Sequence, residues 1–145
     1  MQRSDFEIMA PAGSRETLAA ALQAGADSVY FGIGALNMCA HSAGGFTIDD
    51  LNEIAALCRE HGAKSYLTVN TVIYDGDLAA MREIVSAAKA AGVSAVIASD
   101  VAVMQCCREL GVEVHLSTQL NIANVEALRF YAQFADVVVL ARELT

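Results

Sequence analysis

The sequence has few basic residues for its size. Lys and Arg together number nine against 17 Asp and Glu, which gives a formal net charge of −8 over 145 residues. A nucleic-acid-binding protein normally presents a basic patch to the phosphates, and an anionic membrane surface attracts basic segments. The charge therefore disfavours RNA binding by this chain on its own and predicts that a membrane is not its partner.

Long apolar runs are also missing. A membrane helix needs roughly 18 or more consecutive apolar residues, and no window of this sequence approaches that length. The first residues, MQRSDFEIMAPAGS, lack the apolar stretch of a secretory signal peptide. The expected location is the cytoplasm.

The catalytic motifs of common hydrolases are absent. The sequence contains no G-x-S-x-G and no H-E-x-x-H, and the two glycines in residues 32–34 are only a fragment of a dinucleotide-binding motif. His61 lies in a predicted last helical turn, where a cation complements the helix dipole. His115 lies within a predicted strand, as a packed and hydrogen-bonded core residue, and the role of His41 in a long loop stays open. The sequence predicts no proteolytic nucleophile in this chain.

Four cysteines stand at positions 39, 58, 106 and 107. Successive residues on a helix point about 100° apart, so Cys106 and Cys107 do not chelate one metal as a C-x-x-C pair would. We expect buried or half-buried free thiols, and this chain alone predicts neither a metal site nor a cofactor.

What the sequence does contain is a repeated unit, made of an alanine-rich helical stretch, a Gly or Ala stop and a short apolar run. The stops Gly25, Gly62, Gly92 and Gly111 stand where a helix end requires a left-handed residue. The apolar runs that follow are typical of strands buried on both faces.

An apolar stretch precedes the first unit and predicts an opening strand. Pro11 ends that strand, and Ser14 is placed to cap a helix that starts near Arg15. The pattern predicts five helices between six strands, at about residues 6–10, 27–32, 64–69, 94–98, 112–117 and 136–141. Strict alternation implies parallel strands with right-handed crossovers.

Two α/β architectures fit this alternation: an open doubly wound sheet, and an incomplete (β/α)8 TIM-type barrel. A complete barrel takes about 250 residues, and the last predicted strand is followed by no covering helix. We favour the barrel, with residues 1–145 as the N-terminal part of one barrel domain truncated after its sixth strand. Open sheet edges invite pairing, so the expected partner is the rest of its own barrel or a second copy.

In both architectures ligands bind at the carboxyl ends of the parallel strands. Polar residues follow the predicted strands there and are candidate ligand-binding residues: Asn70, Asp100, Ser117, Gln119, Asn121, Arg142 and Glu143. Helix capping is an alternative role for Asp100, and for Asn121 or Asn124. A salt bridge at the rim is the alternative for Arg142 and Glu143. The long connection 32–47 is either a lid over the site or a simple connector.

Five segments carry a family resemblance: EIMAPAGSRETLAAALQAGADSVYFG, LNMCAHSAGGFTIDDL, YLTVNTVIYDGDL, HLSTQLNIANVEALRFYAQF and VVVLARELT. They resemble the collagenase-like peptidases, a bacterial family of unassigned mechanism, and together span nearly the whole chain. The resemblance implies a barrel-like N-terminal region. Members carry the peptidase label, yet several act in hydroxylation of a tRNA wobble uridine, of ribosomal RNA or of a quinone precursor.

The resemblance also bears on cofactor and site. The hydroxylation members hold an iron–sulfur cluster on downstream cysteines, in an HG..C and GRC pattern that the cysteines of this chain do not match. No cofactor is therefore assigned to this chain, and an iron–sulfur cluster is expected only in the full-length protein. The residues that match family motifs join the candidate ligand-binding set, without an assigned catalytic residue: Pro11, Gly13, Asn37, Asn70, Gln119, Asn121, Arg142 and Glu143.

Two departures from the family pattern affect the long connection. Cys39 replaces the arginine of an LN.RA motif, and Gly45 stands where relatives have asparagine before Phe46. If that arginine holds an anionic ligand in relatives, this chain lacks the corresponding cation at position 39.

The predicted function is that of the N-terminal segment of a collagenase-like peptidase family protein. It is either a peptidase or an iron–sulfur-dependent RNA or quinone hydroxylation factor, to which this segment contributes a ligand mouth. A peptide or RNA substrate is expected only through a C-terminal part, and the 145-residue chain alone is expected to be inactive. The alternative is a non-catalytic βα module that binds a small ligand or a protein.

Overall fold

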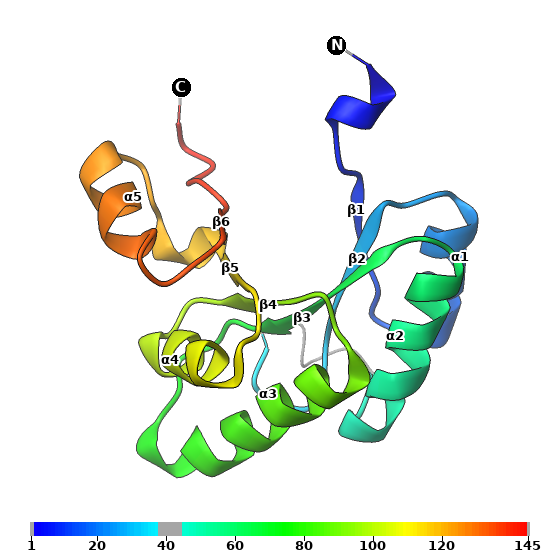
Figure 1. The fold of residues 1–145 in the computed structure, drawn as a ribbon, viewed down its shortest axis with the longest axis horizontal. Coiled ribbons are helices and arrows are strands. Elements are labelled where there is room, and N and C mark those ends of the chain that lie inside the picture. Colours follow the sequence, from blue (N-terminus) through cyan, green and yellow to red (C-terminus); the bar gives the residue numbers. More distant parts are fainter. Residues whose placement is uncertain (1, 38–44, 145) are drawn as a thin grey trace.

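The computed structural model describes residues 2–37 and 45–144, which form six strands alternating with five α-helices (Figure 1). The strands are β1 (Met9–Pro11), β2 (Ser28–Gly32), β3 (Lys64–Val69), β4 (Ala95–Ala98), β5 (Val114–Leu116) and β6 (Val137–Val138). The helices are α1 (Arg15–Gln23), α2 (Leu51–Glu60), α3 (Leu78–Ala91), α4 (Val101–Leu110) and α5 (Val125–Tyr131). Short 3-10 turns are η1 (Arg3–Asp5), η2 (Ile48–Asp50), η3 (Asp75–Asp77) and η4 (Thr118–Leu120). No helix in these described ranges has the length and apolar character needed to cross a membrane.

The strand order decides between the two predicted architectures. All six strands are parallel and lie in one sheet in the order β1-β2-β3-β4-β5-β6. A doubly wound sheet reverses direction at a switch point, so its order is not sequential, whereas a (β/α) barrel is sequential. In the described part of the chain β1 and β6 each pair on one side only. The fold is therefore an incomplete barrel with two open edges, as the sequence predicts.

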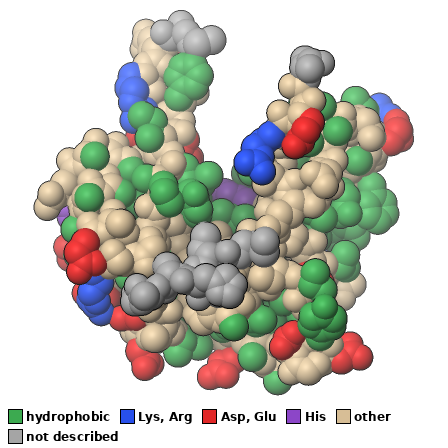
Figure 2. All heavy atoms as spheres, turned by 180° about the vertical axis from the view of Figure 1, so that it is seen from behind, with side chains coloured by type: hydrophobic (Ala, Val, Ile, Leu, Met, Phe, Trp, Pro, Cys, Tyr) green, Lys and Arg blue, Asp and Glu red, His purple; other side chains and the backbone are tan. Residues whose placement is uncertain are grey.

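The pairing register divides the strand residues between two faces. Tyr30 lies opposite Tyr66, and Ile97 lies opposite His115. Since paired residues point to the same side and residues two apart along a strand do so too, these four share one face. Helices α1 to α4 lie along the opposite face, and the first face is hollow between the two ends of the chain (Figures 1 and 2). We call it the open face; its strand residues include Met9, Pro11, Tyr30, Tyr66, Ile97, His115 and Val137.

The main core lies between the sheet and the helices. Phe31, Leu67, Val96 and Leu116, from four neighbouring strands, are each at most 1% exposed. Full burial of such a side chain stabilises the fold by about 1.5–3 kcal/mol. This layer fixes the positions of the strand ends that carry the candidate site residues.

Helix ends agree with the sequence predictions. Ser14 caps α1 by accepting a hydrogen bond from the Thr17 amide, and Asn124 caps α5 by accepting one from the Ala127 amide. Gly92 ends α3 in the left-handed region, with φ of 76°, where a side chain would be strained.

The first strand was predicted wrongly. The pattern gives residues 6–10 with Pro11 as the terminator, whereas β1 is Met9–Pro11 with Pro11 as its last residue. The Asp27 carboxylate accepts a hydrogen bond from the Ile8 amide at 2.6 Å, so that amide is not available to a strand ladder. Proline is tolerated because β1 is an edge strand, in which a missing N–H can face away from the neighbour. The predicted sixth strand, 136–141, also extends well past β6.

Candidate functional site

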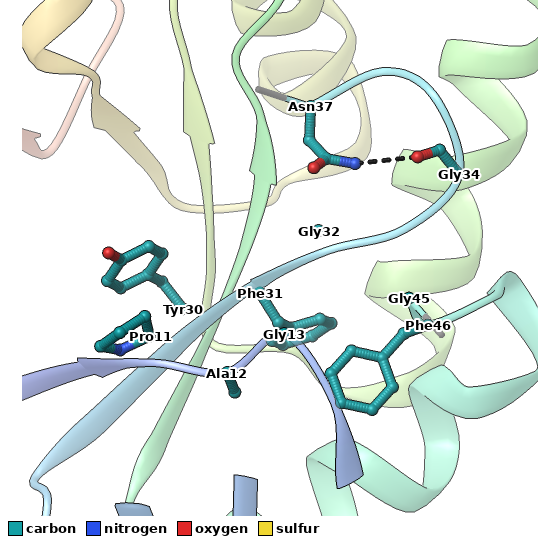
Figure 3. A pocket seen from close by; sticks show the side chains of 10 residues that line it. All are labelled: Pro11, Ala12, Gly13, Tyr30, Phe31, Gly32, Gly34, Asn37, Gly45 and Phe46. Carbon is teal, nitrogen blue, oxygen red and sulfur yellow. Dashed lines mark hydrogen bonds between the residues drawn. The ribbon is translucent and has the colours of Figure 1, made fainter. Parts of the chain in front are cut away.

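A cavity of about 320 Å³ lies at the carboxyl ends of β1 and β2 (Figure 3). Four stretches of the chain line it: residues 11–13, residues 30–32, residues 34 and 37, and residues 45–46. The first two are the ends of β1 and β2, and the last two come from the long connection before α2. The cavity is therefore on the side of the sheet where barrels bind their ligands.

The return of the chain at Phe46 completes the cavity. Phe46 forms a parallel bridge with Ile33, and its carbonyl oxygen accepts a hydrogen bond from the Gly34 amide at 3.3 Å. Its ring meets Phe31 edge to face, with 5.9 Å between the ring centroids. Figure 3 shows Pro11 and Tyr30 side by side, away from the rings of Phe31 and Phe46. Three of the ten described residues that line the cavity are thus aromatic.

Asn37 holds the turn that follows β2. Its side chain is 4% exposed, and Nδ2 donates hydrogen bonds of 3.1 Å to the carbonyl oxygens of Ile33 and Gly34. The carboxamide packs against Gly32 so closely that a Cβ added there would lie 2.6 Å from Nδ2. Only glycine, which has no Cβ, leaves room at position 32 for the side chain of Asn37 in this position.

Three of the ten predicted ligand-binding residues meet in this cavity: Pro11, Gly13 and Asn37. Pro11 contributes its ring, Gly13 its backbone, and Asn37 its buried carboxamide. The Gly13 amide itself donates to Thr17 Oγ1 at 3.0 Å, so it is already paired. That these residues bind a ligand stays a prediction.

Asn70 follows β3 and Asp100 follows β4. Hydrogen bonds at these residues link the segment after β3 to the segment after β4. Asp100 caps α4, because one carboxylate oxygen accepts from the Ala102 amide at 2.8 Å, while the other accepts from the Ile73 amide at 3.1 Å. The Asn70 carbonyl oxygen accepts from Ser99 Oγ at 2.9 Å. The capping role predicted as an alternative for Asp100 is confirmed, and neither residue lines the cavity.

The polar residues after β5 form a tight turn of their own. Ser117 is 5% exposed, and its hydroxyl accepts a hydrogen bond from the Gln119 amide at 3.4 Å. Asn121 ends η4 with φ of 49°, in the left-handed region that asparagine tolerates. The cap of α5 is Asn124, not Asn121. None of Ser117, Gln119 and Asn121 lines the cavity.

Arg142 and Glu143 follow β6 and are exposed. Within the described residues the structure records no ion pair between them, so the salt-bridged rim is not observed. The Ala141 amide before them donates to the Ile122 carbonyl at 3.0 Å, which ties this segment to the turn after β5. Cys39 and His41 lie outside the described residues.

Sequence reasoning missed the aromatic wall of the cavity. Tyr30 and Phe31 lie in a predicted strand and Phe46 in the long connection, and the alternation in SVYFG gives no sign that Tyr30 lines the cavity. It also missed Thr71, whose buried hydroxyl has no hydrogen-bond partner within the described part of the chain. Thr71 directly follows the candidate residue Asn70 after β3. This neighbourhood, in the sequence TVNT, was the one sign that Thr71 lies near the strand end.

A polar network lies on the open face, towards the amino ends of β1 and β3. Tyr66, opposite Tyr30 in the register, donates its hydroxyl to Glu7 at 2.6 Å, and Lys64 donates to the same carboxylate at 2.9 Å. His115 packs its ring against Tyr66 with centroids 4.7 Å apart, and its Nε2 lies 2.8 Å from Glu113. The packed, hydrogen-bonded histidine predicted at position 115 is confirmed.

Burial and hydrogen bonding act against each other at Glu7. Partial burial by itself raises the pKa of Glu7, but the hydrogen bonds from Tyr66 and Lys64 outweigh it and lower this pKa to about 2. At Tyr66, burial and the Glu7 contact both raise the pKa, to about 12. Glu7 is thus ionised and Tyr66 neutral across the physiological range.

The Glu7→Gln substitution is expected to make the free energy of unfolding depend less steeply on pH at acid pH. The folded pKa of Glu7, about 2, is below its value of 4.5 in the unfolded chain. Its contribution is therefore full above about pH 5 and is lost as the pH falls towards 2. Because the side chain is 37% exposed, solvent screening limits the contribution to about 1 kcal/mol. Urea unfolding midpoints between pH 7 and pH 3 measure it.

The matched control is Glu83→Gln, which alters an exposed glutamate of α3. This variant is expected to keep the wild-type dependence of stability on pH. If Glu7→Gln and the wild type lose the same stability between pH 7 and pH 3, Glu7 is not the source of this pH dependence.

The chain is similar to known proteins along nearly its whole length. The model of peptidase family U32 matches residues 13–145. The chain belongs to this family. The match covers the cavity, except for Pro11 and Ala12, and the turns after β3, β4, β5 and β6.

Two curated relatives illustrate the range of names within the family. The chain is 68% identical over 144 residues to a protein of Porphyromonas gingivalis named collagenase, covering 99% of this chain and 35% of that protein. It is 36% identical over 140 residues to tRNA hydroxylation protein P1 of Bacillus subtilis, covering 94% of this chain and 33% of that protein. The chain thus spans about a third of the length of these relatives.

A solved structure shows the same fold. The U32 peptidase Mk0906 superposes with a TM-score of 0.72 at 13% identity, over 92% of this chain and 57% of that one. At this identity the likeness establishes the fold alone. It agrees with the sequential strand order of the sheet.

The described cysteines do not fit an iron–sulfur cluster. Cys58, Cys106 and Cys107 are buried free thiols, as predicted. Burial raises the pKa of each, that of Cys107 to about 12, whereas cluster ligands are thiolates. Among residues 2–37 and 45–144 no three His, Cys, Asp or Glu side chains are grouped to hold a metal ion. No reaction step through a cluster is therefore assigned to these residues.

Proposed function

We propose that this chain forms the first part of a ligand-binding barrel in a longer enzyme of peptidase family U32. The cavity at the ends of β1 and β2 is part of the ligand mouth of that barrel. The observation that carries the proposal is the meeting in one cavity of Asn37 with Pro11 and Gly13, more than 20 residues earlier in the chain, all at positions that match motifs of the resemblance. The chain spans about a third of its relatives, so the groups that perform the chemistry are expected in the remainder.

The reaction proposed first is cleavage of a peptide. Its support is the 68% identity to the protein named collagenase, together with the acidic charge of the chain. In this scheme the cavity binds and orients part of the substrate. Correct positioning of a bound substrate lowers the entropic part of the barrier.

Asn37→Ala is expected to lower peptidase activity of the whole protein encoded by the gene by at least about tenfold, mainly through a higher KM. The substitution leaves the carbonyl groups of Ile33 and Gly34 without their donor, so the turn that lines the cavity loosens. Initial rates on a labelled collagen peptide over a range of concentrations give kcat and KM.

Asn52→Ala is the control for that experiment, because Asn52 is an exposed asparagine of α2 outside the cavity. Its activity is expected to equal that of the wild type. A wild-type KM and kcat in Asn37→Ala would refute the assignment of the cavity as the ligand mouth.

RNA hydroxylation is the second candidate, favoured by the 36% identity to tRNA hydroxylation protein P1. Insertion of oxygen needs a redox cofactor, and its ligands would come from the remainder of the longer protein. Mass spectrometry of RNA nucleosides from cells with and without the gene tests it, together with iron and sulfide assays on protein purified without oxygen. Loss of a hydroxylated nucleoside on deletion, without any peptide cleavage, would replace the first candidate by the second.

A further inference from the structure

We propose that His115 is an acid–base group that this chain contributes to the interior of the longer enzyme. Its ring nitrogen Nδ1 takes the proton of a water molecule that attacks a peptide carbonyl, and Glu113 positions the ring. The inference rests on the proposed function, with peptide cleavage as the reaction. It deepens that proposal by placing one of the reacting groups on β5, with the others expected in the remainder.

His115 lies on the open face of the sheet, in a strand of three residues. It is the middle residue of β5, opposite Ile97 of β4 and Val137 of β6. The open face is the hollow side of the molecule in Figure 2, and in a complete barrel this side of the strands faces the interior. Catalytic residues of such barrels come from the ends of several strands, and only Leu116 separates His115 from the end of β5.

Two contacts fix the imidazole ring. Nε2 lies 2.8 Å from Oε1 of Glu113, and the ring packs against Tyr66 with 4.7 Å between the ring centroids. Tyr66 is on β3, and the small side chain of Ala95, beside Tyr66 on the intervening β4, lets the two rings meet. The Tyr66 hydroxyl is itself bound to Glu7. It therefore does not compete for a nitrogen of His115.

The contact with Glu113 defines which nitrogen can act. An ionised carboxylate accepts hydrogen bonds and donates none, so in the neutral ring Nε2 carries the hydrogen and Nδ1 carries the lone pair. A carboxylate that holds one ring nitrogen while the other meets the reacting group is how enzymes orient a histidine base. Nδ1 is therefore the atom of His115 that can accept a proton.

Nδ1 is available for this role. The His115 side chain is 9% exposed, and within the described ranges the structure records no hydrogen bond at Nδ1. The described side-chain atoms that are buried without a partner are Ser28 Oγ and Thr71 Oγ1. Nδ1 is not among them, so it keeps access to the open face. An apolar residue would fill this place without leaving a polar atom half-satisfied, which is costly in a protein interior.

The proposed step needs water and the peptide alone. The water oxygen forms a bond to the carbonyl carbon of the peptide as one water proton passes to Nδ1. The bond from this carbon to the amide nitrogen then breaks, and the proton on Nδ1 passes to the leaving nitrogen, which becomes an amine. A carboxylic acid and an amine result, and His115 returns to its neutral state.

His115→Gln in the whole protein encoded by the gene is the first test. The Gln side chain can still donate to Glu113 but is not a useful base. With a labelled collagen peptide, we expect kcat to fall at least about hundredfold and KM to change by less than about threefold. The control is His61→Gln, at an exposed histidine after α2, which should keep the wild-type kcat. A wild-type kcat in His115→Gln would overturn the proposal.

Chemical rescue separates basicity from packing. His115→Ala is assayed with added imidazole or pyrazole, two rings of the same size of which pyrazole is by far the weaker base. We expect imidazole to raise the rate at least about tenfold and pyrazole to leave it unchanged. Equal rescue by both rings would show that the ring only fills space and would overturn the proposal. If His115→Ala does not fold, His115→Gln alone decides.

Glu113→Ala tests the positioning role. We expect kcat to fall at least about tenfold and the ¹⁵N signals of the His115 ring to change from hydrogen on Nε2 alone to a mixture of the two tautomers. Unchanged ring signals and kcat would remove Glu113 from this role.

The kinetics also separate this inference from the proposed function. If His115→Gln keeps the wild-type kcat while Asn37→Ala raises KM, the proposed ligand mouth stands and this inference fails. If His115→Gln loses kcat while Asn37→Ala has normal kinetics, the reverse holds. A wild-type protein that cleaves no peptide would overturn this inference together with the first candidate reaction.

Discussion

Gly32→Ala is expected to destabilise the chain by about 2–3 kcal/mol and to disorder the cavity. The added Cβ would lie 2.6 Å from Asn37 Nδ2 and closer still to the other atoms of the carboxamide. The side chain of Asn37 is buried and bound to two carbonyl oxygens, so it cannot move aside without breaking those hydrogen bonds. Chemical denaturation measures the loss, and the side-chain amide signals of Asn37 report the displacement.

Gly76→Ala is the matched control. A Cβ added at Gly76, in η3, would meet nothing within 4 Å, so its stability is expected to remain within about 0.5 kcal/mol of the wild type. Equal effects of the two substitutions would show that contact with Asn37 is not the cause.

A double-mutant cycle makes the same prediction more specific. Once Asn37 is alanine, the space beside Gly32 is free, and Gly32→Ala should then cost at least about 1 kcal/mol less than it does in the wild type. Strict additivity of the two substitutions would contradict direct contact between these residues. The cycle thus separates crowding from a general weakness of β2.

The fold could be predicted from sequence because its signals are local and repeated. Helix stops such as Gly92 and caps such as Ser14 act within one turn of the chain, and the structure confirms both. The start of β1 could not be predicted, since it depends on Asp27, some twenty residues away, capturing the Ile8 amide. Local hydrophobicity at residues 6–8 carries no information about that contact.

The site could be predicted only in part for a related reason. Parallel strands bring their carboxyl ends to one side, so polar residues after them are reasonable candidates. Which of them share a cavity depends on the return of Phe46 beside Ile33, a contact between distant parts of the connection. That return encloses Asn37 and leaves Gln119 and Arg142 outside. The wall residues themselves are apolar, so a search for polar chemistry passes over them.

The open edges of the sheet lead to the last prediction: the 145-residue chain is expected to self-associate at micromolar concentrations. Apolar side chains are exposed along both edges, with Ile8 at 52% and Met9 at 44% at or beside β1, and Val137 at 43% and Leu140 at 48% at or beside β6. Unpaired backbone groups beside apolar side chains are a template for pairing with another strand. A second copy is the partner available in a purified sample. Sedimentation velocity over a range of concentrations measures the association.

Charge on both edges should prevent this association. The double variant Met9→Lys and Val137→Lys is expected to raise the dissociation constant by at least about tenfold, because pairing would bring like charges together and bury them. Val72→Lys, at an exposed valine in the β3–α3 connection, is the control and should associate like the wild type. A monomeric wild-type chain at all concentrations would contradict the prediction. In a longer protein whose own segments cover the edges, the same double substitution should instead lower the free energy of unfolding, since the lysines would then be buried within one barrel.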